Sequence, residues 1–315
     1  MHSQWPQLFY QDYKETYFTL HRWLQIIGKI KLNKAPCPNH SWHASFKLTS
    51  SGMTTMPFPD QDRTLTIDFD FLSHSITFTT SDGDHVTRDL RSESVSDFYE
   101  RVKKTLDFLN VNAQFSARPN ELPDAIPFYK DTQHCEYDPF YAQDLWQAMT
   151  KVDVALSKFR ARFVGRASEP LFFWGSFDLA CSRFSGRRAP EHPGGIPHLP
   201  DKVVKEAYSH ELFTCGFWPG NEIYPPPAFF CYIYPEPNEF AKDELRNKAA
   251  FYHQNLGEYI LPYEAVALST NPEAVLLEFL DECYQKASRL GNWEKEKLES
   301  DAYLLRLQAK NSATH

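Results

Sequence analysis

The chain has 315 residues, a formal net charge of −8 and 42% hydrophobic residues. Aromatic residues reach 15%, which excludes disorder over most of the chain. An acidic chain lacks the positive surface that nucleic acid requires, and no apolar run is long enough to span a membrane, so neither is an expected partner. The six cysteines form no Cys-x-x-Cys pair, and no secretory signal pattern is present. Free thiols and a cytoplasmic location are therefore expected.

The first half of the chain predicts a helix, several strands and a second helix. Residues 15–32 place their apolar side chains on one helical face, and Pro36 ends this helix. Strands are predicted at 42–49, 64–71 and 75–80. Ser94 begins the second helix, because Asp97 follows this N-cap residue at the spacing of a capping box.

The second half predicts the same order of elements. Residues 119–138 are rich in proline and predict an irregular connector, after which Asp138 and Pro139 begin a helix that runs to about residue 164. Strands are predicted at 170–175, 177–184, 213–217 and 228–234, with a short helix at 201–211. Asn271 begins the last long helix.

These patterns predict an α+β fold in which one or two antiparallel sheets pack against long helices. The order helix, strands, helix occurs twice, and Ala44–Leu48 is similar to Gly175–Leu179. This similarity fits two pseudo-duplicated halves, and it fits equally a single domain without internal symmetry. The expected organisation is a first half at 1–118, a connector at 119–138, a second half at 139–291 and a charged C-terminal helix or tail at 292–315.

Histidines suggest a metal site. His40 and His43 are three residues apart, and they converge on one ion only if a strand begins between them. The alternative is that one bonds to the backbone while the other faces solvent. His210 is the third candidate ligand, because a complete site draws ligands from elsewhere in the chain.

Acid–base chemistry has four candidate residues. Glu206 and His210 are four apart on the predicted helix and could pair, and a carboxylate beside a histidine raises its basicity. Glu211, next to His210, is a further candidate for the carboxylate. The alternative is a helix-end histidine bound to the terminal carbonyls. Asp178 is an acid–base candidate if its strand face lines a cavity, and otherwise a partner of Arg183. His192 precedes a proline and two glycines that let the backbone approach a ligand.

The segment from Phe172 to Gly195 turns from an aromatic strand into a charged loop. Arg183 and Arg187 in this loop predict a clamp for a carboxylate or phosphate group, and the alternative is an exposed turn with solvated arginines. Aromatic side chains are expected to wall the pocket. The candidates are Trp42, Trp174 and Trp218.

Together these residues favour an enzyme that acts on a small anionic molecule, with a divalent metal ion as the candidate cofactor. Two alternatives remain: a small-molecule-binding module without catalysis, and a structural or interaction protein with an aromatic core. The oligomeric state is left open.

Several motifs resemble those of a bacterial family labelled only as a domain of unknown function, family five-nine-nine-six. They are Thr19–Trp23, Asn39–His43, Phe172–Leu179, Arg183–Arg187, Ala207–Glu211, Phe217–Gly220 and Tyr234–Pro237. The similarity runs from about residue 16 to about residue 293. The family has no assigned activity, so the resemblance implies neither a cofactor nor a catalytic residue.

Overall fold

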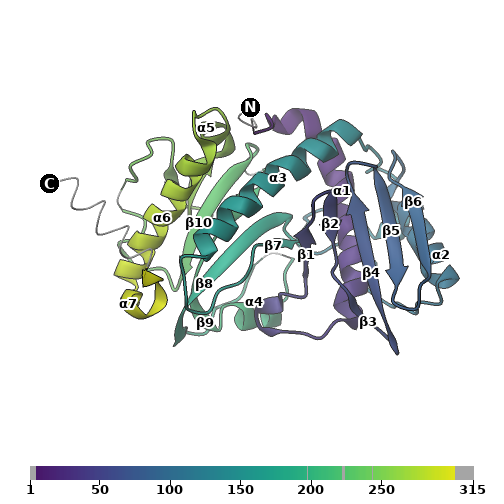
Figure 1. Ribbon diagram of the computed structural model, residues 1–315, viewed down its shortest axis with the longest axis horizontal. Helices are drawn as coiled ribbons and strands as arrows, with labels where there is room; N and C mark the ends of the chain where they lie inside the picture. Colours follow the sequence, from purple (N-terminus) through teal and green to yellow (C-terminus); the bar gives the residue numbers. More distant parts are fainter. Residues whose placement is uncertain (1–4, 197, 222–223, 243, 302–315) are drawn as a thin grey trace.

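The structure, a computed structural model, describes residues 5–301 except 197, 222–223 and 243. Its described part is an α+β fold in which one antiparallel sheet of twelve strands packs against helices (Figure 1). The helices are α1 (Tyr10–Lys34), α2 (Val95–Phe108), α3 (Pro139–Arg160), α4 (Asp201–Ala207), α5 (Tyr263–Ala267), α6 (Pro272–Leu290) and α7 (Lys295–Leu298). The strands are β1 (Ser45–Leu48), β2 (Gly52–Thr54), β3 (Phe58–Asp60), β4 (Arg63–Asp70), β5 (Ser75–Thr80), β6 (His85–Asp89), β7 (Leu171–Phe173), β8 (Asp178–Arg188), β9 (His210–Trp218), β10 (Ala228–Tyr234), β11 (Phe251–His253) and β12 (Glu258–Pro262).

The sheet joins the two predicted halves. Its strand order is β11-β12-β10-β9-β8-β7-β1-β2-β4-β5-β6, with β3 paired to β4. The connection is made by β1 and β7, where Phe46 lies opposite Phe172. The two halves therefore share one antiparallel sheet, which is one of the two arrangements that the sequence predicted. A pseudo-duplication is not confirmed.

Helix α1 forms the centre of the core and contacts both halves. Trp23 is fully buried and stacks on Phe98 of α2, with the ring centroids 4.6 Å apart. On another side of the same helix, Tyr17 packs against Phe177 in the turn that precedes β8. Every residue from 19 to 30 is buried, including the polar Arg22 and Gln25, so other parts of the chain cover this helix on all sides.

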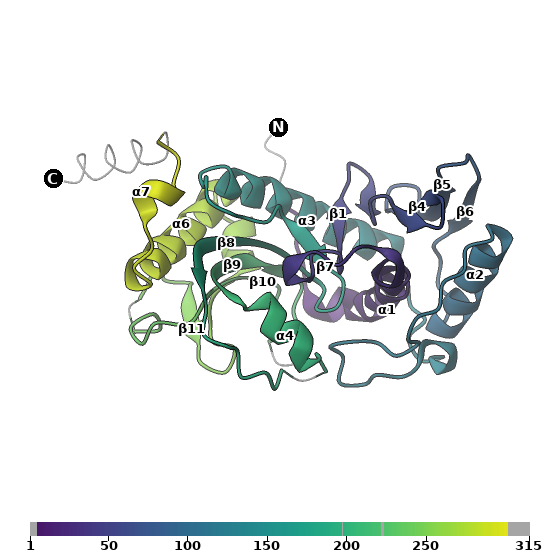
Figure 2. The ribbon, with the colours of Figure 1, turned by 90° about the horizontal axis from the view of Figure 1, so that it is seen from below.

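The strands of the second half have two different faces. In Figure 2, α3 and α6 lie on one side of β8, β9 and β10, while α4 lies on the other. The side under α3 and α6 is apolar and contains Cys181, Cys215 and Cys231, which lie opposite one another on adjacent strands. All six cysteines of the chain are free.

The opposite side, which we call the α4 face, consists of the even-numbered residues of β8, β9, β10 and β12. One row across it is apolar: Ala180, Gly216, Phe230 and Ile260. The next row is polar, and Ser182, Thr214 and Tyr232 lie opposite one another in it. The α4 face thus presents polar side chains beside an apolar strip.

Most predicted elements are present, with shifted ends. The strand predicted at 75–80 is found at those residues, and the strand predicted at 64–71 is β4. The helix predicted at 201–211 ends at Ala207, so that His210 and Glu211 begin β9 instead. The short elements β2, β3, β6, β11, β12 and α5 were not predicted. The predicted tail beyond residue 301 lies outside the described residues, and none of the described helices is long and apolar enough to cross a membrane.

Candidate functional site

Three carboxyl groups interact beside the α4 face. Asp178 comes from β8, Glu258 from β12 and Glu121 from the connector, and we call them the acidic cluster. Burial raises the pKa of Asp178 to about 6. Burial together with the charge of Asp178 raises the pKa of Glu121 to about 7 and that of Glu258 to about 8. All three residues are half-buried, so solvent still reaches them. Near pH 7 the Asp178 carboxyl is therefore mainly ionised and the Glu258 carboxyl mainly protonated.

The turn before β8 places Asp178 and Glu121 together. Ser176 donates a hydrogen bond to the Asp178 carboxylate, which opposes part of the effect of burial on its pKa. A side chain on Gly175 would collide with the Glu121 carboxyl group. Glycine at this position therefore allows the Glu121 side chain to lie against the turn.

Two tyrosines extend the acidic cluster across the α4 face. The Tyr208 hydroxyl, at the end of α4, donates to the Tyr232 hydroxyl over 3.1 Å. Cys231 lies opposite Tyr259, so Tyr232 and Glu258 are the next pair of neighbours on β10 and β12. Burial raises the pKa of Tyr208, and the charges of Glu258 and Asp178 raise it further. Both phenols are therefore neutral hydrogen-bonding groups beside the carboxyls.

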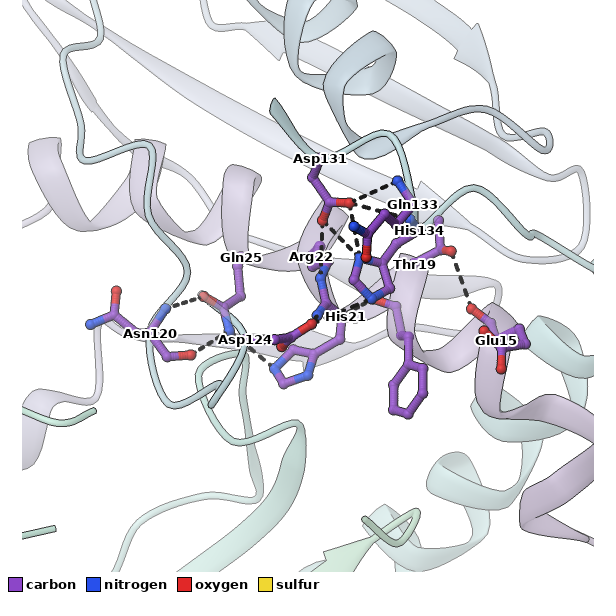
Figure 3. A network of polar contacts seen from close by, with 11 residues as sticks. Glu15, Thr19, His21, Arg22, Gln25, Asn120, Asp124, Asp131, Gln133 and His134 are labelled. Atoms are coloured by element: carbon purple, nitrogen blue, oxygen red, sulfur yellow. Dashed lines mark hydrogen bonds and ion pairs between the residues drawn. The ribbon is translucent and has the colours of Figure 1, made fainter. Parts of the chain in front are cut away.

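The connector is fastened to α1 by a network around Arg22 (Figure 3). The Arg22 guanidinium lies 2.6 Å from the Asp124 carboxylate and 3.2 Å from that of Asp131. His134 completes the network, with Nδ1 2.8 Å from Asp131 and Nε2 3.5 Å from Asp124. Because Arg22 and Asp131 are both buried, the network fixes this part of the connector strongly.

A second group of contacts holds the connector next to Glu121. Asn120 donates its backbone N–H to Gln25 over 2.7 Å and accepts from the same side chain over 2.8 Å. Lys29, also on α1, donates to the Asn120 side chain and lowers the pKa of Glu121 against the effect of burial. The Glu121 carboxyl is thus held in place by residues that lie outside the sheet.

His192 lies at the edge of the α4 face. Its ring packs against Tyr208 and Tyr234, with centroid distances of 4.7 and 5.1 Å. Its Nδ1 accepts the Gly194 N–H over 3.0 Å, which assigns the proton of the neutral ring to Nε2. The histidine is therefore a neighbour of Tyr208 rather than a direct partner of a carboxyl group.

The structure does not bring the predicted metal ligands into a set of three among the described residues. His40 and His210 have ring centroids 5.9 Å apart, but His40 Nδ1 donates to the Ala207 carbonyl over 2.7 Å. The carboxylate of Glu206 binds the His40 backbone N–H, not an imidazole. Among the described residues, no group of three or more His, Cys, Asp or Glu side chains is placed to hold a metal ion. This includes the predicted set of His40, His43 and His210.

The two arginines of the predicted anion clamp contact other groups of the protein. Arg183 is fully buried, lies 3.4 Å over the Phe159 ring and donates to the Phe159 carbonyl. It follows Leu179 and Cys181 on the side of β8 that faces the helices, which explains its burial. Arg187 pairs with Glu211 at 2.7 Å, so the structure joins two of the predicted site residues to each other.

The three tryptophans lie in different places. Trp42 packs beside His40 and under the Arg166 guanidinium. Trp174 packs on Gly28 of α1. Trp218 alone lies on the α4 face, within the apolar group that includes Phe230.

Two cavities lie outside the acidic cluster. The larger, of about 410 Å³, is lined by residues 7–11, by Tyr224 and Pro225–Pro227, and by residues around α5. The smaller, of about 380 Å³, lies at the end of α2. Neither is lined by a residue of the acidic cluster. We place the candidate site at the α4 face because that face carries the perturbed carboxyl groups, which an apolar cavity lacks.

Sequence reasoning found Asp178 but missed its partners. Glu258 could have been noticed as a charged residue at the start of the apolar run Tyr259–Leu261. Glu121 lies in an irregular segment with no periodic pattern, so no local signal marks it. Tyr208 lies in the motif Ala207–Glu211, but the sequence predicted no role for it or for Tyr232.

The fold and the site define an α+β protein with a carboxyl cluster on one face of an antiparallel sheet. The chain belongs to a family of unknown function, DUF5996, whose model matches residues 5–300. No curated protein and no solved structure matches the chain.

Proposed function

We propose that the chain is an enzyme that transfers protons with the acidic cluster, Asp178 acting as the base and Glu258 as the acid. The supporting observation is that one half-buried face carries carboxyl groups whose pKa values, about 6 for Asp178 and about 8 for Glu258, lie on opposite sides of neutrality. A base must be ionised and an acid protonated at the same pH, and two carboxyls in different surroundings meet that condition.

The proposal keeps a small molecule as the substrate but not an anionic one. Arg183 is buried and Arg187 is paired with Glu211, which leaves neither to bind an anion. The ionised Asp178 would also repel one. The proposed reaction is assigned to the side chains of the acidic cluster.

We also propose a cytoplasmic location. The six cysteines are free, and four of them are buried in the core. Free thiols in this number are expected of a protein in a reducing compartment.

The test is a screen of para-nitrophenyl esters and glycosides with the wild-type protein and the Asp178→Asn variant. We expect the wild-type rate to follow a bell-shaped pH profile, rising as Asp178 ionises near pH 6 and falling as Glu258 ionises near pH 8. Asp178→Asn should lower the rate by at least about a hundredfold.

Asp68→Asn is the matched control, because Asp68 is also a half-buried aspartate on a strand and lies outside the acidic cluster. This control should keep the wild-type rate. Equal rates for wild type and Asp178→Asn with every substrate would contradict the proposal. Ligand binding without turnover would then indicate the alternative, a binding module.

A further inference from the structure

Trp218 carries a buried hydrogen-bond donor that has no partner. Its side chain is 9% exposed, and its indole nitrogen Nε1 makes no hydrogen bond. Leu179 lies opposite Phe217, so the next residues, Asp178 and Trp218, are neighbours on the α4 face. Buried hydrogen-bond donors nearly always have an acceptor, so this N–H is a candidate to donate to a bound molecule.

Aromatic rings connect Trp218 to the acidic cluster. The ring centroids of Trp218 and Phe230 are 5.7 Å apart, those of Phe230 and Tyr232 are 6.2 Å apart, and those of Tyr232 and Tyr208 are 6.3 Å apart. On the other side, Tyr224 lies 5.9 Å from Trp218. Trp218 and Phe230 are buried, whereas the three tyrosines are half-buried, so this aromatic track reaches solvent through hydroxyl-bearing rings.

The polar groups along the track restrict the chemistry of a ligand. The Trp218 N–H requires an acceptor, whereas the ionised Asp178 carboxylate requires a donor. A simple cation offers no acceptor to the indole. An anion is repelled by Asp178, and the predicted arginine partners are engaged elsewhere. A hydroxyl group donates and accepts at once, and it carries no charge that must be neutralised.

We propose that the α4 face binds a neutral, hydroxyl-rich molecule of the carbohydrate class. Trp218 Nε1 donates to an oxygen of this ligand, and the carboxyl groups of Asp178 and Glu258 bond to its hydroxyls. The C–H groups of a sugar ring lie against the exposed parts of Tyr232 and Tyr208, since aromatic rings combine an apolar surface with a polar end. This proposal takes the location of the site from the proposed function, on which it rests, and adds the class of ligand.

The experiment titrates the full chain with glucose, N-acetylglucosamine, maltose and cellobiose, followed by calorimetry and by tryptophan fluorescence. Citrate and choline serve as the charged comparison ligands. We expect saturable binding of at least one neutral sugar and none of citrate or choline. Trp218→Phe keeps the ring and removes the N–H, so it should weaken sugar binding by about tenfold.

Trp174→Phe is the matched control. Trp174 is also buried, and its indole N–H also has no partner, but it packs on Gly28 of α1 and does not lie on the α4 face. This variant should bind sugar as the wild type does. A thermal unfolding curve for each variant shows that it is folded before it is titrated.

Three results would overturn the ligand class: no binding of any of the four sugars, binding of citrate or choline instead, or equal weakening by Trp218→Phe and Trp174→Phe. The catalytic proposal fails separately. Asp178→Asn retains a hydrogen-bonding side chain, so this variant should still bind the sugar. If a sugar binds but neither the wild type nor this variant turns it over, the ligand class is supported and the catalytic proposal is contradicted.

Discussion

Arg22 and Asp131 form an ion pair in which both side chains are almost completely excluded from solvent. The Arg22 Nε atom lies 3.2 Å from the Asp131 carboxylate, and the two side chains are 2% and 0% exposed. A buried charge is tolerated only when its partners remain in place, so each residue depends on the other.

Asp131→Asn should therefore lower the free energy of unfolding by about 3–5 kcal/mol, because Arg22 would lose a buried counter-charge. Chemical denaturation at neutral pH measures this change. The exposed Asp89→Asn is the control, and its expected effect is within about 0.5 kcal/mol of zero. A loss for Asp131→Asn no larger than that of the control would show that the ion pair is not structural.

The same pair predicts sensitivity to acid. Burial acts to raise the pKa of Asp131, but hydrogen bonds from His134 and the charge of Arg22 hold it below the usual value of 3.8. The stabilisation is present above that value and is lost as the pH falls through the lower native pKa. In acid, the stability of Asp131→Asn should approach that of the wild type, which a series of denaturation curves can measure.

Glu258 predicts the opposite dependence on pH. Burial and the charge of Asp178 raise its pKa from 4.5 to about 8. Between these two values the native state binds more protons than the unfolded state, so the stability that Glu258 contributes falls as the pH rises. At pH 8, Glu258→Gln should be more stable than wild type, with a free energy of unfolding at least about 1 kcal/mol higher. At pH 5 this difference should be smaller. The exposed Glu264→Gln should show neither change, and a pH-independent effect of Glu258→Gln would contradict the assignment.

The cysteines should separate into two classes by reactivity. Cys37 is exposed and Cys135 half-buried, whereas the other four are buried. Burial raises the pKa of Cys181 to about 12 and raises that of Cys231 as well, so their reactive thiolate forms are rare. Native protein should release two equivalents of product rapidly with dithiodipyridine, and the remaining four only in denaturant. Rapid reaction of more than two thiols would contradict the packing of α6 on the sheet.

Gly28→Ala tests the packing of Trp174 on α1. A Cβ atom on Gly28 would lie 2.5 Å from the indole ring, so the two groups must move apart. We expect a loss of about 1–3 kcal/mol in the free energy of unfolding, as for other overpacked cores. The double variant with Trp174→Phe should recover part of this loss, because the smaller ring relieves the collision. Additive losses would indicate that the two residues are not in contact.

The sequence predicted the regular elements better than the site. The strand at 75–80 was predicted at its observed residues because Ile76 and Phe78 alternate with polar residues and a turn follows. The burial of Arg183 was not predicted from its charge, although Leu179 and Cys181 on the same side of β8 mark that side as core. The grouping of Asp178 with Glu258 and Glu121 could not be predicted, since it depends on which strands pair and on where the connector packs. Those contacts are long-range, and no local pattern records them.

The pairing of β1 with β7 makes the two halves of the chain interdependent. Neither half has a complete sheet of its own at this junction, and α1 from the first half also supplies Tyr17 to the turn before β8. A break of the backbone inside the connector would leave two polypeptides, each with an exposed strand edge that only the other fits. The protein is therefore suited to fragment complementation, in which two separately made pieces restore one fold when they meet.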